Sequence, residues 1–142
     1  MRALDKLGPM TRGVEDALMV LAAISGPDAG DVDSVPSKLD YDGNAGVKGL
    51  RVGYFPAWMR KAPADVDRAA LETVPKLGMV PVEVALPGWP DPRRPMPEFS
   101  PPRRVPHGVT LIGRLFDEGT LGRVGLALEQ AFGVAAQRPP GF

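Results

Sequence analysis

The sequence contains no cysteine and only one histidine, His107. Without cysteine these residues can form no disulfide, thiolate metal site or cysteine nucleophile, and one histidine cannot complete an ordinary zinc site. An excess of positive charge is also missing, because 17 basic residues balance 17 acidic ones, whereas nucleic-acid-binding proteins are typically basic. We therefore expect no metal, no cofactor and no direct contact with nucleic acid.

Long hydrophobic runs are absent as well. The longest, residues 17–24, has eight residues and is too short to cross a bilayer, and the charged N-terminus lacks the apolar core of a signal peptide. The composition is that of a globular protein, with 44% hydrophobic and 24% charged residues. We expect a soluble, cytoplasmic protein without a membrane segment.

Proline is the residue in excess. Eight of the 17 prolines fall within residues 87–106, where the apolar residues follow neither a helical nor a strand period. Such a segment cannot build a core of its own. It divides the chain into an α/β segment, residues 1–86, a proline-rich seam, residues 87–106, and a C-terminal strand and helix within residues 107–142.

The clearest predicted element is a helix that follows Gly13 or Thr11 as its N-cap and ends before Gly26. Acidic residues in its first turn favour this direction, because the N-terminus of a helix carries partial positive charge. The face predicted to be buried comprises Val14, Ala17, Leu18, Leu21, Ala22, Ile24 and Ser25.

Strands and helices alternate along the rest of the chain. Residues 50–55 predict a buried strand, Asp65 can cap a second helix, and the alternation in residues 80–86 predicts a strand with one buried face. Together they predict a βαβ unit with parallel strands. After the seam, residues 108–113 predict a third strand and Asp117 caps a third helix. The fold class is therefore α/β, with a short mixed or parallel sheet and flanking helices.

Three patterns weakly resemble functional sites. The three aspartates in residues 28–33 resemble a calcium loop but lack its later glutamate, which favours a solvated turn. Gly119, Gly122 and Gly125 resemble a phosphate-binding loop but lie within a helical pattern, which favours close packing. His107 could be a ligand or a base, yet a lone loop histidine is more often solvated.

The four serines offer no candidate nucleophile. None belongs to a Gly-x-Ser-x-Gly turn, and none has an evident base beside it. They are Ser25, Ser34, Ser37 and Ser100. We therefore assign no catalytic, cofactor-binding or metal-binding residue.

Several stretches, taken in order, resemble the amidase-signature family. Residues 7–28 contain a Gly-Pro-Met-Thr-Arg turn that leads into an apolar helix, and residues 31–34 resemble the loop that follows in the family. Later parts of the family's sequence resemble residues 49–54, together with the helix and strand after them, and residues 106–121. The resemblance implies amide hydrolysis by a serine, helped by a second serine in a cis peptide and by a lysine. The family includes general amidases and the A subunit of the glutamyl-tRNA(Gln) amidotransferase.

The chain departs from the family's pattern in two places. In the family, the lysine and a glycine- and serine-rich nucleophile region precede the Gly-Pro-Met-Thr-Arg turn, and only seven residues do so here. A long segment of the family is also replaced by the seam. No lysine of this sequence maps onto the catalytic one: Lys6, Lys38, Lys48, Lys61 and Lys76. We interpret the chain as an N-terminally truncated and internally deleted member.

Three hypotheses about function follow. The first is a remnant of an amide hydrolase that is not catalytic by itself, because covalent catalysis needs an activated nucleophile and oxyanion donors. The second is the C-terminal half of a split amidase or of a split amidotransferase A subunit, which works only with a partner chain that carries the catalytic region. The third is a small α/β module that binds proteins. We also expect uncovered apolar surface that favours self-association, at Val80, Val82, Val84 and Leu111.

Overall fold

The computed structural model describes residues 8–60, 65–85 and 108–137, and these fall into two compact units. Unit 1 comprises residues 1–46 and 111–142, and unit 2 comprises residues 47–110. The predicted seam at residues 87–106 lies outside the described residues, as do Ser100 and His107.

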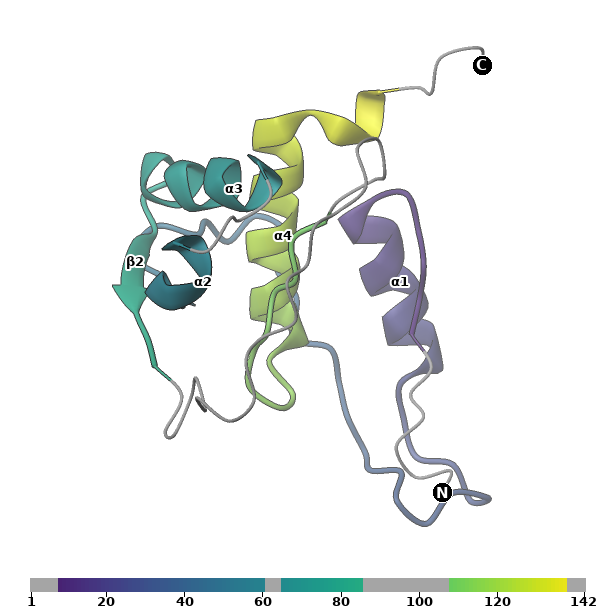
Figure 1. Ribbon diagram of the computed structural model, residues 1–142. Helices are drawn as coiled ribbons and strands as arrows, with labels where there is room; N and C mark the ends of the chain where they lie inside the picture. Colours follow the sequence, from purple (N-terminus) through teal and green to yellow (C-terminus); the bar gives the residue numbers. More distant parts are fainter. Residues whose placement is uncertain (1–7, 61–64, 86–107, 138–142) are drawn as a thin grey trace, which may run out of the picture. The chain divides into compact units, whose positions relative to one another are not determined.

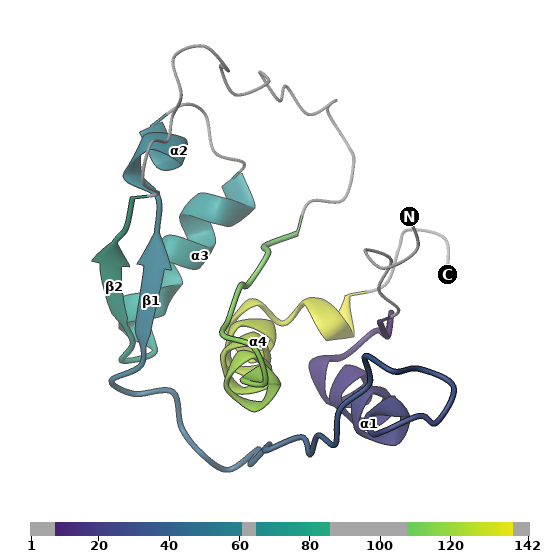
Figure 2. The same ribbon diagram turned by 90° about the horizontal axis from the view of Figure 1, so that it is seen from below.

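Unit 1 is built on two helices that pack side by side, α1 (Val14–Ile24) and α4 (Glu118–Phe132), followed by the short 3-10 helix η1 (Val134–Ala136) (Figures 1 and 2). Both long helices were predicted from the hydrophobic period, and both are confirmed. The buried core between them includes Leu18 of α1 and Val124 and Leu128 of α4. This core is small, because each helix contributes one stripe of apolar side chains.

The ends of α1 follow the sequence closely. Gly13 is the N-cap, and the helix stops at Ile24 with Ser25 in extended conformation. Gly26 then adopts a φ of 144°, which side-chain-bearing residues rarely reach, so the predicted stop at this glycine is confirmed. The predicted breadth of the buried face is wrong, because Ile24 is 58% exposed and Ala22 is exposed. Within unit 1, α4 is the main packing partner of α1, and it covers a narrower stripe than the sequence offers.

Unit 2 contains the predicted strand–helix–strand unit. Strand β1 (Arg51–Tyr54) pairs in parallel with β2 (Val80–Glu83), with Arg51 opposite Val80 and Tyr54 opposite Glu83. Helix α3 (Asp65–Lys76) connects them, and its Ala70 and Val74 are buried. The parallel βαβ arrangement and the α/β fold class are thus confirmed. A short helix that was not predicted, α2 (Pro56–Arg60), follows β1, and its Trp58 ring lies 4.3 Å from that of Phe55.

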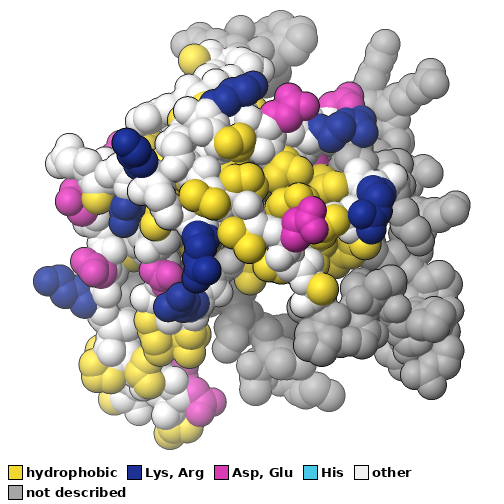
Figure 3. All heavy atoms as spheres, turned by 90° about the vertical axis from the view of Figure 1, so that its left-hand side faces the viewer, with side chains coloured by type: hydrophobic (Ala, Val, Ile, Leu, Met, Phe, Trp, Pro, Cys, Tyr) yellow, Lys and Arg dark blue, Asp and Glu magenta, His cyan; other side chains and the backbone are white. Residues whose placement is uncertain are grey.

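The strands of unit 2 are less buried than the sequence predicts. Residues along β1 alternate between exposed and half-buried, and in β2 only Val82 is half-buried. Val80 and Val84 are 47% and 37% exposed, so the uncovered apolar surface predicted at these two positions is confirmed. Figure 3 faces the side of the molecule that carries β2 and shows hydrophobic side chains at the surface among charged ones. The prediction of a buried strand at residues 50–55 is wrong, because a parallel strand is buried on both sides only where helices cover both faces of the sheet.

The predicted third strand is not formed. Residues 108–113 have no strand partner among the described residues, and the side chain of Ile112 is 86% exposed. The β-branched residues in this stretch favour an extended chain, but a strand also needs a neighbour to which its backbone can hydrogen-bond. The helix after it begins where predicted, with Asp117 as N-cap, although the Asp117 side chain makes no capping bond.

Candidate functional site

The three glycines near the start of α4 mark the closest approach between parts of unit 1. A side chain at Gly119 would overlap the backbone carbonyl of Asp40, and one at Gly122 would collide with the Leu18 side chain. At Gly125 the nearest atoms belong to Val14, at an ordinary contact distance of 3.4 Å. The interpretation of these glycines as a packing surface, in place of a phosphate loop, is therefore confirmed.

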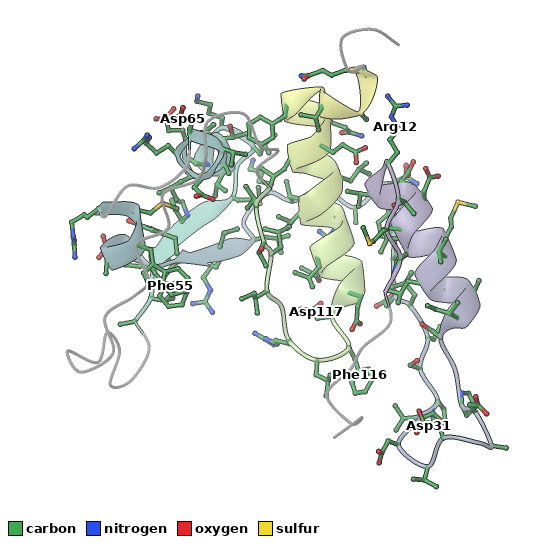
Figure 4. All side chains as sticks on the ribbon, turned by 45° about the vertical axis from the view of Figure 1, so that its right-hand side comes forward. Arg12, Asp31, Phe55, Asp65, Phe116 and Asp117 are labelled. Carbon is green, nitrogen blue, oxygen red and sulfur yellow. The ribbon has the colours of Figure 1, made fainter. Side chains whose placement is uncertain are left out.

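The N-terminus of α1 is capped from α4. The Glu129 carboxylate accepts a hydrogen bond from the backbone N–H of Val14 at 2.8 Å, across 115 positions of sequence. The negative charge also lies where the dipole of α1 favours it. Arg12 donates to the backbone carbonyl of Gln137 at 3.2 Å, and Figure 4 shows it at the start of α1, beside η1. The Gly-Pro-Met-Thr-Arg turn is thus fastened to the end of α4.

Replacing Glu129 with alanine is expected to lower the free energy of unfolding by about 1–2 kcal/mol, because a part-buried N–H loses a charged acceptor. Glu129→Gln keeps an acceptor oxygen and loses only the charge, so its loss should be less than half as large. Chemical denaturation monitored by circular dichroism measures both. Equal losses in the two variants would contradict the capping role.

The segment that follows α1, up to residue 46, also hydrogen-bonds to α4. Arg123 donates to the backbone carbonyls of Ala45, at 3.1 Å, and Gly46. Neither this arginine nor Glu129 stood out in the sequence, since their backbone partners lie 77 or more positions away. Only the folded chain brings these groups together.

The aspartate-rich segment after α1 forms a turn that its own side chains stabilise. Asp28 accepts from the N–H of Gly30 at 2.8 Å, and Asp31 accepts from that of Asp33 at 3.0 Å. The Ser34 hydroxyl accepts from the N–H of Asp28 at 2.7 Å and donates to the carbonyl of Asp31 at 2.7 Å. In the part of the chain that is described, no group of histidine, cysteine or acidic side chains is arranged to hold a metal ion. The predicted turn is confirmed.

The three described serines, Ser25, Ser34 and Ser37, all belong to unit 1. The Ser25 hydroxyl donates to the carbonyl of Leu21 one turn back in α1, at 2.6 Å, and that of Ser34 belongs to the aspartate turn. Ser37 is exposed, and Ser100 lies outside the described residues. Bonds of this kind, from a hydroxyl to local backbone, are typical of structural serines.

An open hollow of about 460 Å³ lies next to α1 in unit 1. Its polar lining residues are Ser25, Ser37, Lys38 and Glu118. Phe116 also lines it, and Figure 4 shows this residue just before α4. Its φ of 64° is unusual for a residue with a side chain, and it is 60% exposed. The remaining lining residues are Leu21, Val35, Pro36 and Leu39.

In unit 2 the Tyr54 hydroxyl donates to the Glu83 carboxylate at 3.1 Å, between paired positions of β1 and β2. This hydrogen bond is the largest cause that raises the pKa of Tyr54, and partial burial and the Glu83 charge add to it. Because the folded-state pKa lies above the unfolded one, the interaction is complete below the ordinary tyrosine pKa. It is lost as the pH rises through the raised value.

Replacing Glu83 with alanine is therefore expected to shift the pKa of Tyr54 downward, toward its ordinary value. Tyr41 must be changed to phenylalanine in both proteins, since its pKa is also raised, by burial and then by Glu15. Ultraviolet absorbance as a function of pH then follows Tyr54 alone. An unchanged midpoint in the Glu83→Ala protein would show that the hydrogen bond does not form in solution.

Comparison with known proteins defines the class. The model of the amidase family, described as Amidase, matches residues 2–98, which include the Gly-Pro-Met-Thr-Arg turn, α1 and the β1–α3–β2 unit. The chain belongs to this family. The resemblance at residues 106–121 lies outside the matched region and stays a prediction.

The curated relatives that match the chain are of one kind within this family. The A subunit of glutamyl-tRNA(Gln) amidotransferase from Staphylococcus aureus strain MRSA252 is 42% identical over 92 residues, which are 60% of this chain and 19% of the relative. The same proteins of strains JH9 and Newman are 41% identical over the same length. The chain thus spans about a fifth of the length of these curated relatives. No solved structure matches it significantly. No helix in the described ranges is long and apolar enough to cross a membrane.

Proposed function

We propose that this chain, by itself, is a non-catalytic segment of an amide-hydrolase fold. The observation that supports the proposal is the set of hydrogen-bond partners that its serine hydroxyls have. The hydroxyls of Ser25 and Ser34 are bonded to nearby backbone carbonyls, and Ser37 is exposed. An activated serine needs a base within hydrogen-bonding reach and donors aimed at the oxyanion. None of the described serines has that arrangement.

The chain's own contribution is the α1–α4 scaffold and the βαβ unit. Glu129, Arg123 and the packing glycines contact the backbone and side chains of unit 1 and hold its parts together. Amide hydrolysis, and the glutamyl-tRNA chemistry in the name of the relatives, would then require catalytic residues from elsewhere in the polypeptide or from another chain. A second candidate, half of a split amidase completed by a partner, is favoured by the apolar surface that α1 leaves exposed.

A serine-directed fluorophosphonate probe tests the proposal. The native chain is incubated with the probe, and its intact mass is measured beside a heat-unfolded sample. We expect no stoichiometric adduct in the native chain. An adduct on one of the four serines, present in the native sample and absent after unfolding, would reveal an activated nucleophile and overturn the proposal.

A further inference from the structure

Helix α1 is apolar around its whole circumference after the first turn. Its charges, Glu15 and Asp16, lie in the first turn, and every residue from 17 to 24 is alanine, valine, leucine, isoleucine or methionine. A surface helix normally carries an apolar stripe on one side and polar residues on the other. A helix that is apolar on all sides is one that is buried on all sides in its working state.

Only one side of α1 is covered by another described helix. Leu18 is buried against α4, and Val14 and Leu21 are half-buried. With about 100° between successive helical residues, the side opposite Leu18 holds Val20, Ala23 and Ile24, with Met19 next to them. Met19, Val20 and Ile24 are 71%, 42% and 58% exposed. We call these four residues the outer face of α1. No other described helix of unit 1 lies on that side (Figures 1 and 2).

The charges at the two ends of this face indicate what covers it. Asp16 lies on the same side as the outer face at the N-terminal end, and exposed Asp28, Asp31 and Asp33 follow the C-terminal end. A second copy of this chain, packed parallel or antiparallel on the outer face, would bring acidic groups against acidic groups at both ends. Such like-charge contacts are unfavourable in an interface. The surface suits a different partner, apolar in the middle and basic at its borders.

We propose that the outer face of α1 binds the complementary part of an amidase polypeptide, the part that carries the catalytic serines and lysine. This inference rests on the proposed function, in which this chain lacks those residues. The family match includes α1, and the region shared with the amidotransferase relatives is only 19% of their length. In such relatives the same stretch of sequence is therefore accompanied by a much larger polypeptide.

Co-expression tests the inference directly. The probe is the Staphylococcus aureus relative from which the 92 matched residues are deleted, expressed with this chain and separated by size-exclusion chromatography with light scattering. We expect a soluble one-to-one complex. The double variant Val20→Asp and Ile24→Asp should bind at least about 100-fold more weakly, because two charges would be buried in an apolar contact. Both positions are exposed, so circular dichroism of the variant alone should be unchanged.

The control is Val32→Asp, which introduces a single charge at a position 97% exposed outside α1, and it should weaken binding far less than the double variant does. Thiol protection gives a second readout, because the sequence has no cysteine. A cysteine at position 24 (Ile24→Cys) should react with maleimide at least about tenfold more slowly in the complex, while one at position 32 (Val32→Cys) should not.

Three results would overturn the inference. The first is that no soluble complex of this chain with the probe forms. The second is that the double aspartate variant forms the complex equally well. The third is that the native chain self-associates and the double variant does not. The last would make a second copy the occupant. A fluorophosphonate adduct on the chain alone, in contrast, would overturn the proposed function and leave the binding result standing.

Discussion

Gly119→Ala is expected to lower the free energy of unfolding of the chain by about 2 kcal/mol, although alanine is the better helix former. Alanine improves helix propensity by about 1 kcal/mol, whereas forcing an atom into a filled space costs up to about 3 kcal/mol. The obstacle is the backbone carbonyl of Asp40, which cannot turn aside as a side chain could. The loop before residue 46 would have to move away from α4.

Gly125→Ala is the matched control in the same helix. Its new methyl group would meet Val14 at 3.4 Å, an ordinary contact, so the propensity gain should dominate and raise the stability by up to about 1 kcal/mol. Urea denaturation of the two variants and the native chain gives both values. If Gly119→Ala were as stable as Gly125→Ala, the close approach of Asp40 to α4 would not exist in solution.

Leu18→Ala should have the largest effect of any single substitution in α1, a loss of about 3 kcal/mol. Leu18 is 7% exposed, and its side chain fills the space above Gly122. The loss combines the transfer of the missing methyl groups with the cavity that remains. Met19→Ala, at the neighbouring position that is 71% exposed, should change the stability by less than about 0.5 kcal/mol.

A double-mutant cycle links this prediction to the packing of α1 on α4. Gly122→Ala alone should destabilise the chain, because its methyl group would collide with Leu18. In the Leu18→Ala background the same change fills vacated space and should stabilise. If Gly122→Ala changed the stability by the same amount in both backgrounds, or destabilised the Leu18→Ala variant more than the native chain, the two positions would not be in direct contact.

The sequence predicted the local elements well where turn chemistry and period agreed. Gly13 and Gly26 mark the two ends of α1. The glycine spacing in α4 predicted close packing, and the structure confirms it. The parallel pairing of β1 with β2 followed from the helix between them. In each case a few neighbouring residues contain the necessary information.

Burial was predicted less well, because it depends on what else is present to pack against. The alternation of valines in β2 by itself predicts a buried face, whereas the separate prediction of uncovered surface at Val80 and Val84 is the one that is confirmed. Ile24 and the residues from 108 to 113 have the composition of buried or paired segments and lack the neighbours. In each case apolar side chains are left exposed that the sequence pattern alone would place in a core.

Long-range polar contacts were not predictable at all. Glu129 looks like one of several charges on α4, and its role depends on the N-terminus of α1, 115 positions away. The same holds for Arg123 and the carbonyls of Ala45 and Gly46. The expectation that no serine has a base beside it stays a prediction, since Ser100 lies outside the described residues.

Amide hydrolysis by the purified chain decides whether this segment is catalytic without help. Ammonia or amine release from small amides is measured beside a control chain in which Ser25, Ser34, Ser37 and Ser100 are all alanine, so that traces of host amidase contribute equally to both. We predict the same rate for the two proteins, equal to the background without either. A rate that exceeds the background and disappears in the serine-free control would contradict the proposed lack of catalysis.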